Sequence, residues 1–180
     1  MIKTPKTVRE FGKCEVSDVC HGTYQAFDAF SQEYLSSIGF HFGDLTQATY
    51  FATTNGAGGR IVKANLSFKN LMDIGPDDWG WIDCKRAALL CHYKFSQSKI
   101  PVDREAFAKI LGQNEWNLAD YKPTEKMTTD ERGAFADLLR AHDIDGVRYT
   151  NNCEPPGKAG GTAYFVLNAN QIEIRSIREL

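Results

Sequence analysis

The sequence has no long apolar run. None of its stretches approaches the about 18 consecutive apolar residues that a membrane-spanning helix needs. Its first residues, MIKTPKTVREFGK, also lack the apolar centre of a secretory signal peptide. We therefore expect no membrane segment and a cytoplasmic location.

The chain also has little net charge. Its formal net charge at pH 7 is -2, so it lacks the positive footprint with which proteins attract nucleic acid. A local basic patch is compatible with this balance, but a dedicated nucleic-acid-binding module is not expected.

Cysteine is scarce and odd in number. The five cysteines are Cys14, Cys20, Cys84, Cys91 and Cys153. Their odd count and irregular spacing argue against a disulfide framework and favour a reducing compartment. The pairs Cys20-His21 and Cys91-His92 could in principle supply zinc ligands, but no two cysteines have the close spacing of a zinc knuckle. Adjacent strand residues also point to opposite faces, which argues against a cysteine–histidine nucleophile pair. We expect no metal.

The 180 residues contain no repeat, low-complexity tract or linker, so we expect a single domain over residues 1–180. Alternating patterns predict strands at EVSDVC, RIVKANLSF, GVRYTN, TAYFVLN and QIEIRSI. Strands thus occur at both ends with helices mostly between them, which predicts an α+β fold with a largely antiparallel sheet.

Helical spacing and capping residues predict the helices. The expected helices cover 23–39, a short segment capped by Asp44, 81–95, the segment from Asp103 to Leu111, and 130–144 behind a Thr128–Glu131 capping box. Residues 70–83 are expected to form a loop that leads into the third of these helices.

The tripeptide His21-Gly22-Thr23 ends the first expected strand. Glycine has no Cβ, so a ligand can approach its backbone, whose N–H and C=O can bind a planar carboxamide edge to edge. His21 and Thr23 each offer a polar group to a ribose hydroxyl. The pattern suits a nucleotide, although HGT alone is unspecific.

A second segment, GFHFGD, places Phe40, His41 and Phe42 between two glycines. In an extended chain the phenylalanines point to one side and the histidine to the other. The simplest interpretation is that the phenylalanines are core residues and His41 is a surface residue. The alternative is that His41 forms part of a small-molecule site.

In this order and spacing, HGT, FDAF, GFHFGD and Ala48 resemble the front half of the ADP-ribosyltransferase fold. LLRAHDIDGVRYTNNCE and the closing TAYFVLNANQIEI resemble its back half. The resemblance covers residues 18–54 and 133–175 and is closest to the ADP-ribosyltransferase-like domains of phage and mobile-element polyvalent proteins. It implies an α+β fold of split antiparallel β-sheets with flanking helices.

The resemblance also implies an enzyme that uses NAD as a co-substrate. Such enzymes cleave the nicotinamide–ribose bond and pass ADP-ribose to an acceptor, here a macromolecule and most simply a protein. Positive charge develops on the ribose, as in glycoside hydrolysis, so a carboxylate is needed beside it. As an effector or phage product, the protein would find its acceptor in the cytoplasm of a cell. The alternatives are an NAD glycohydrolase and a degenerate domain that binds a nucleotide or protein without catalysis.

The same resemblance assigns roles to residues of the front half. His21 would bind the ribose as the first member of the family's His-Tyr-Glu set, Gly22 would bind the carboxamide, and Thr23 would offer a hydroxyl. His41 stands where relatives of the poly-ADP-ribose-polymerase type carry a stacking tyrosine. It is assigned to nicotinamide together with its neighbour Phe42.

Two further residues are candidates for contacts with NAD. Tyr50 would form the opposite wall of the nicotinamide slot, the alternative being an aromatic residue at a helix surface. Arg60 and the backbone N–H groups of NGAGGR would meet the pyrophosphate, unless this segment is a plain hairpin loop.

The catalytic carboxylate is assigned by resemblance as well. Relatives of the polymerase type carry it just before the tyrosine of TAYFVLN, where this chain has Ala163. The polyvalent-type pattern has an acidic residue after YxN, which here is Glu154. We therefore assign catalysis to Glu154, the alternative being a solvated loop glutamate. Asn151, Asn152 and Gln171 are additional polar candidates for orienting the sugar.

Overall fold

The computed structural model of the chain describes residues 13–32, 38–54, 58–77, 85–112, 125–152 and 161–180. The elements in chain order are β1 (Cys14–Thr23), β2 (Phe40–Phe42), α1 (Leu45–Thr54), β3 (Arg60–Phe68), β4 (Leu71–Asp77), α2 (Lys85–Gln97), α3 (Arg104–Leu111), α4 (Thr129–Ala141), β5 (Gly146–Asn151), β6 (Gly161–Val166), the 3-10 helix η3 (Ala169–Gln171) and β7 (Ile172–Glu179).

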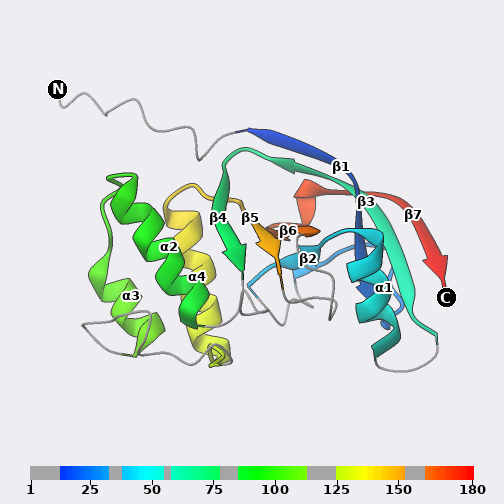
Figure 1. Cartoon of the computed structure of the whole chain (residues 1–180), viewed down its shortest axis with the longest axis horizontal. Helices are drawn as coiled ribbons and strands as arrows, with labels where there is room; N and C mark the ends of the chain where they lie inside the picture. The colour runs from blue at the N-terminus through cyan, green and yellow to red at the C-terminus, as the bar shows by residue number, and fades with distance from the viewer. Residues whose placement is uncertain (1–12, 33–37, 55–57, 78–84, 113–124, 153–160) are drawn as a thin grey trace.

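These strands form two sheets. The three-stranded sheet has the order β1-β3-β7 and is antiparallel throughout. The four-stranded sheet has the order β2-β6-β5-β4, and its only parallel pair within the described residues is β4–β5. The expected α+β class with largely antiparallel strands is confirmed. Figure 1 shows α2, α3 and α4 gathered at one end of the molecule, with α1 at the other end beside β1 and β3.

Successive residues of a strand point to opposite faces of its sheet. Both faces of the four-stranded sheet carry buried apolar side chains. Phe40 and Phe42 of β2 and Val166 of β6 pack against Leu66 and Phe68 of the three-stranded sheet. The two sheets therefore share one core. The prediction that Phe40 and Phe42 are core residues is confirmed, since they are 8% and 0% exposed.

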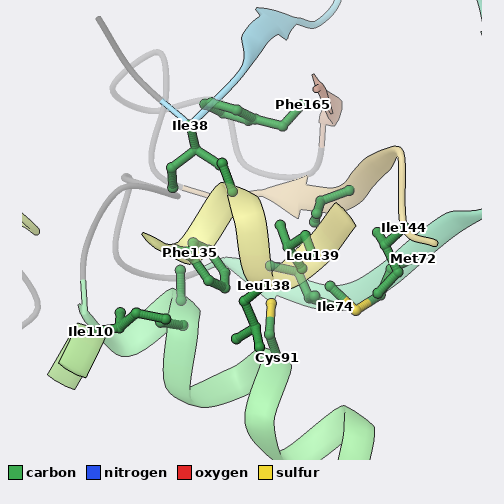
Figure 2. Close-up of a cluster of buried hydrophobic side chains, with 14 of the residues drawn as sticks. Ile38, Met72, Ile74, Cys91, Ile110, Phe135, Leu138, Leu139, Ile144 and Phe165 are labelled. Atoms are coloured by element: carbon green, nitrogen blue, oxygen red, sulfur yellow. The ribbon is translucent and has the colours of Figure 1, made fainter. Parts of the chain in front are cut away.

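The opposite face of the four-stranded sheet packs against the helices. Tyr149, Ala163 and Phe165 belong to the same buried cluster as Phe135 and Leu139 of α4. In Figure 2, side chains of α2, α4 and β4 meet in this cluster, among them Cys91, Leu138, Met72 and Ile74. Burial of each large apolar side chain stabilises the fold by about 1.5–3 kcal/mol.

Local capping signals fix the helix ends as expected. Asp103 accepts a hydrogen bond from the Ala106 N–H at the start of α3, which ends at Gly112 with a φ of 77°. At the start of α4, Thr128 and Glu131 form the complete capping box. These predictions are confirmed because a cap depends only on residues within one turn.

The predicted helix over 23–39 is wrong for its described residues 24–31, which form bends and irregular structure. The Gln25 N–H bonds the Thr23 hydroxyl oxygen at 3.0 Å, which turns the chain directly after β1. Phe27 and Phe30 then pack around the His21 ring. Tertiary contact thus overrides the helical spacing of these aromatics.

The predicted loop over 70–83 is wrong for Leu71–Asp77, which forms β4. Leu71 faces the core between the sheets, whereas Met72 and Ile74 face the helices. A strand buried on both faces shows no polar alternation, so its pattern is easily missed. Gly75 and Pro76 lie where the β4–β5 register shifts, at the edge of the sheet, where proline is tolerated.

Candidate functional site

The two glycine-containing motifs meet where β1 passes the end of β2. The Cys20 N–H donates to the Gly43 carbonyl oxygen at 2.8 Å, and the Gly43 N–H donates to the Cys20 carbonyl oxygen at 2.9 Å. This pair of bonds joins the three-stranded sheet to the four-stranded sheet. It brings HGT and GFHFGD side by side although they are about 20 positions apart in the sequence.

Gly22 lies one residue pair beyond this bridge. Backbone groups of a strand alternate between its two edges, so the N–H and C=O of Gly22 point to the same edge as those of Cys20. Perpendicular to the strand, a Cβ on Gly22 would overlap the carbonyl oxygen of Ala48 in α1. Glycine is therefore required here for the close approach of a helix, and its backbone N–H and C=O lie on the edge of β1 that faces β2.

His21 points to the other face of β1, into the space between the sheets. Its Nδ1 donates to the carbonyl oxygen of His41 at 2.7 Å, since a carbonyl can only accept. The neutral ring must then carry its proton on Nδ1 and keep Nε2 as an acceptor. Burial lowers the pKa of His21, which favours this neutral form, and the bond to the carbonyl opposes that effect only in part.

Aromatic rings hold the His21 imidazole in place. Phe30, Phe42 and Phe27 lie with their ring centroids 5.3, 5.6 and 6.2 Å from it. Phe42 is fully buried, so in this structure it supports His21 and has no face exposed toward a ligand. Its assignment to direct nicotinamide contact stays a prediction, and in this structure Phe42 contacts the His21 ring.

His41 has a different set of neighbours. Its ring lies on Phe165 at a centroid distance of 5.1 Å, meets Phe51 of α1 at 5.5 Å, and places Nε2 2.8 Å from the Tyr149 hydroxyl. Burial, with a smaller contribution from the charge of His21, lowers the pKa of His41 to about 3. The ring is therefore neutral near pH 7. His41 is half-buried as a residue, so the interpretation of His41 as a surface residue is wrong.

The two histidine rings are thus linked without touching each other face to face. His21 sits among the phenylalanines between the sheets, and His41 lies on the opposite face of the four-stranded sheet beside Tyr149 and Phe165. The connection between them is the backbone carbonyl of His41. A ligand that used both rings would have to span the end of β2.

Thr23 and Arg60 stand opposite each other on β1 and β3, and Arg60 in turn pairs with Glu179 on β7. Thr23 is buried, and its hydroxyl oxygen accepts the turn bond from Gln25, which leaves the hydroxyl proton available to donate. The Arg60 guanidinium bonds Glu179 at 2.7 Å. An anion at Arg60 would therefore compete with a carboxylate.

Tyr50 lies on the outer surface of α1. Its side chain is 36% exposed, and its ring meets Phe51 at a centroid distance of 5.7 Å. It is Phe51, one residue on, that contacts His41. The structure thus places Phe51, which the sequence did not single out, closer to the aromatic group than Tyr50.

Glu154 lies outside the described residues. The strands before and after it are described, and Asn151 at the end of β5 pairs with Gly161 at the start of β6. A Cβ on Gly161 would approach Gln47 and Asp44 at the start of α1, so these strand ends lie beside α1. Asn151 and Gly161, which end and begin these strands, therefore lie next to the GFHFGD motif.

Asn151, Asn152, Gln171 and Ala163 also have described positions, and Asn152 is half-buried directly after β5. Asn151 is 1% exposed at the end of β5. Gln171 bonds the Asn168 N–H and the Ser67 carbonyl, which makes it a structural residue beside β7. Ala163 is fully buried against the helices, so a carboxylate at this position would lie in the core.

Sequence reasoning missed two members of the site. Tyr149 and Phe165 form the surroundings of His41 from β5 and β6, and both are strand residues with ordinary apolar patterns. A signal existed for Tyr149, because the Y-x-N spacing in a strand puts Tyr149 and Asn151 on one face. No sequence pattern near Tyr149 predicted that its hydroxyl would contact His41.

Two negative findings complete the description. Among the residues that the structure describes, no group of three or more His, Cys, Asp or Glu side chains is arranged to hold a metal ion. Over the same residues, no helix is both long and apolar enough to cross a membrane.

Comparison with known proteins gives one distant structural similarity. No family model matches the chain, and no curated protein matches it. The fold is similar to a chain in the crystal structure of the MbcT–MbcA toxin–antitoxin complex of M. tuberculosis, with a TM-score of 0.41 and 13% sequence identity over 94% of this chain and 87% of that one. Neither value is high enough to transfer an activity.

Proposed function

We propose that the protein cleaves NAD at the nicotinamide–ribose bond and transfers ADP-ribose to a macromolecular acceptor, most simply a protein. The observation that supports this is the bridge between Cys20 and Gly43. It brings HGT and GFHFGD together. The backbone N–H and C=O of Gly22, the Nε2 acceptor of His21 and the neutral ring of His41 therefore lie near the point where β1 passes β2.

The nicotinamide would bind at Gly22. The N–H of this residue can donate to the oxygen of a carboxamide and its C=O can accept from the NH2 group, and the Thr23 hydroxyl can donate as a third contact. His41 suits a neighbouring stack because it is neutral at physiological pH. A charged imidazolium would repel the cationic nicotinamide ring of NAD, whereas a neutral ring attracts it.

The ribose would bind at His21. With Nδ1 fixed on the His41 carbonyl, the free Nε2 can only accept, which matches the hydrogen of a sugar hydroxyl. The aromatic residues around His21 hold this orientation before any ligand arrives. Such preorganisation avoids ordering a side chain when the ligand binds.

Glu154 would supply the negative charge. Two residues separate it from Asn151, which limits its Cα to within about 11 Å of that of Asn151. The C1′–N bond breaks, nicotinamide leaves as a neutral molecule, and the carboxylate stabilises the sugar cation. An acceptor nucleophile then forms a bond to C1′ and loses its proton. Ala163 is buried, so the catalytic acid is expected at another position.

Two alternative functions are compatible with the same residues. An NAD glycohydrolase would pass ADP-ribose to water, and a degenerate domain would bind a nucleotide or protein without cleaving it. The absence of an acid at Ala163 favours the second of these. The test is to incubate the purified protein and a cell lysate with labelled NAD.

Free nicotinamide together with a discrete labelled macromolecule supports transfer. Nicotinamide with only free ADP-ribose would show hydrolysis instead. Intact NAD after long incubation would contradict catalysis and leave a binding module.

A further inference from the structure

Tyr149 of β5 is buried, and its hydroxyl lies 2.8 Å from Nε2 of His41 on β2. The two ring planes differ by 15°, and their centroids are 6.0 Å apart. The contact joins the Tyr149 hydroxyl on β5 to the Nε2 atom of the imidazole on β2, two strands that are not neighbours in the sheet.

The other contacts of the His41 ring are aromatic. Phe165 lies nearly parallel to the ring, at 21°, and Phe51 stands almost perpendicular to it, at 83°. A half-turn of the ring about the Cβ–Cγ bond keeps its plane and its aromatic contacts but moves Nε2 away from the hydroxyl. The hydrogen bond to Tyr149 distinguishes these two orientations, because it requires Nε2 to face the hydroxyl.

From this arrangement we propose that Tyr149 is a positioning residue for NAD: its O–H donates to Nε2 of His41, which fixes both the rotation of the ring and the tautomer with the proton on Nδ1. The proposal rests on the proposed function, because it gives His41 the task of contacting nicotinamide. It gives Tyr149 of β5 a defined task in the orientation of His41.

The expected consequence is a site that is set before NAD binds. The His41 ring is held from β5 through Tyr149, and the His41 carbonyl holds His21 on β1. One residue of β2 therefore connects groups from both sheets. Loss of the Tyr149 hydroxyl should release the ring and leave the backbone bond to His21 in place.

The first test is nitrogen NMR of the histidine side chains in the wild-type protein, with the His41 signals assigned by their loss in H41Q. We expect a neutral His41 with its proton on Nδ1 and a bare, hydrogen-bonded Nε2. A proton on Nε2 would overturn the proposal without the need for any Tyr149 variant.

The second test compares nicotinamide release by wild type, Y149F and Y164F. Tyr164 is a matched control because it lies on the adjacent strand β6, is partly buried and packs on the opposite face of the same sheet. In Y149F we expect the His41 NMR signals to change and KM for NAD to rise about three- to tenfold with little change in kcat, as for a lost hydrogen bond used in binding. Y164F should change neither.

The outcomes separate the two proposals. Active wild-type protein with an unchanged KM in Y149F would overturn the role of Tyr149 alone. A fall in kcat with KM unchanged would also overturn it, because the ring would then not serve binding. Wild-type protein that leaves NAD intact would overturn the proposed function and, with it, this role of Tyr149.

Discussion

At the scale of single residues, two histidines in one short segment have acquired different surroundings. His21 donates from Nδ1 to a carbonyl and sits among phenylalanines, whereas His41 meets a tyrosine hydroxyl through Nε2. Burial lowers the pKa of both rings. Both therefore act as neutral, oriented hydrogen-bonding groups rather than as proton carriers near pH 7.

Removing the His41 ring should weaken NAD binding. If the ring stacks on nicotinamide, the His41→Ala variant should lose about 1 kcal/mol of binding free energy, or about fivefold in Kd. Calorimetric titration with NAD measures this. His142→Ala is the control, because His142 also packs on an aromatic ring, that of Phe95 at 4.7 Å, but lies outside the motifs. Equal effects of both variants would contradict a specific role.

Replacing the Glu154 carboxylate by an amide should abolish catalysis. Glu154→Gln removes only the charge, so nicotinamide release should fall at least about a hundredfold while NAD binding and the thermal midpoint change little. Glu105→Gln in the first turn of α3 is the matched control. A release rate near that of the wild type would move the catalytic role to another residue.

At the scale of elements, α1 lies directly on the three-stranded sheet because two glycines make room for it. A Cβ on Gly22 would overlap the Ala48 carbonyl oxygen, and one on Gly59 would overlap that of Ala52. Asp44 and Gln47 cap the same helix through two reciprocal bonds of 2.8 and 3.0 Å. The start of α1 is therefore fixed beside GFHFGD.

Alanine variants at these two glycines distinguish an effect on helix packing from an effect on ligand binding. Gly22→Ala and Gly59→Ala should both lower the unfolding free energy by about 1–3 kcal/mol, because each forces α1 away from the sheet. Urea unfolding measures this. Only Gly22→Ala should also reduce NAD affinity in the protein that remains folded. Equal NAD affinities of the two variants would contradict the assignment of the carboxamide to Gly22.

The elements that could be predicted from the sequence are those with local signals. The helices α3 and α4 carry their own caps, and β3 alternates polar and apolar residues along its length. The segment 24–31 and β4 were predicted wrongly, because their conformation depends on rings or strands far away in the sequence. Local propensity gives no information on such partners.

At the scale of the whole molecule, the four-stranded sheet lies between the three-stranded sheet on one side and α2–α4 on the other (Figure 1). The candidate site lies at the crossing of β1 and β2. His21 lies between the two sheets, and His41 lies beside Tyr149 and Phe165 on the other face of the four-stranded sheet. Folding buries both rings, which couples their protonation to folding.

Stability should consequently fall in mild acid. An unfolded histidine takes up a proton as the pH drops below about 6.5, whereas folded His41 does so only near 3. The unfolded state thus binds more protons in this window, so stability is full above about pH 6.5 and declines as the pH falls toward 3. The pKa values of His21 and His92 are also lowered, chiefly by burial, and act in the same direction.

Urea unfolding at about pH 7.5 and about pH 5 tests this prediction. For His41 alone the loss should be up to about 2 kcal/mol between the two conditions. The His41→Gln variant should show a smaller decline, since its amide gains no proton. An identical pH dependence of the two proteins would show that His41 is not buried as a neutral ring.

The sequence by itself determined the fold class, the helix caps, and the fact that His41 points to the opposite face from Phe40 and Phe42. These follow from spacing and from side-chain chemistry, which act within a few residues. Only the tertiary structure decided that Gly22 receives a helix, that Phe42 supports His21, and that Tyr149 holds His41. Each of these is a contact between strands or helices distant in the chain, and packing of the whole core selects such contacts.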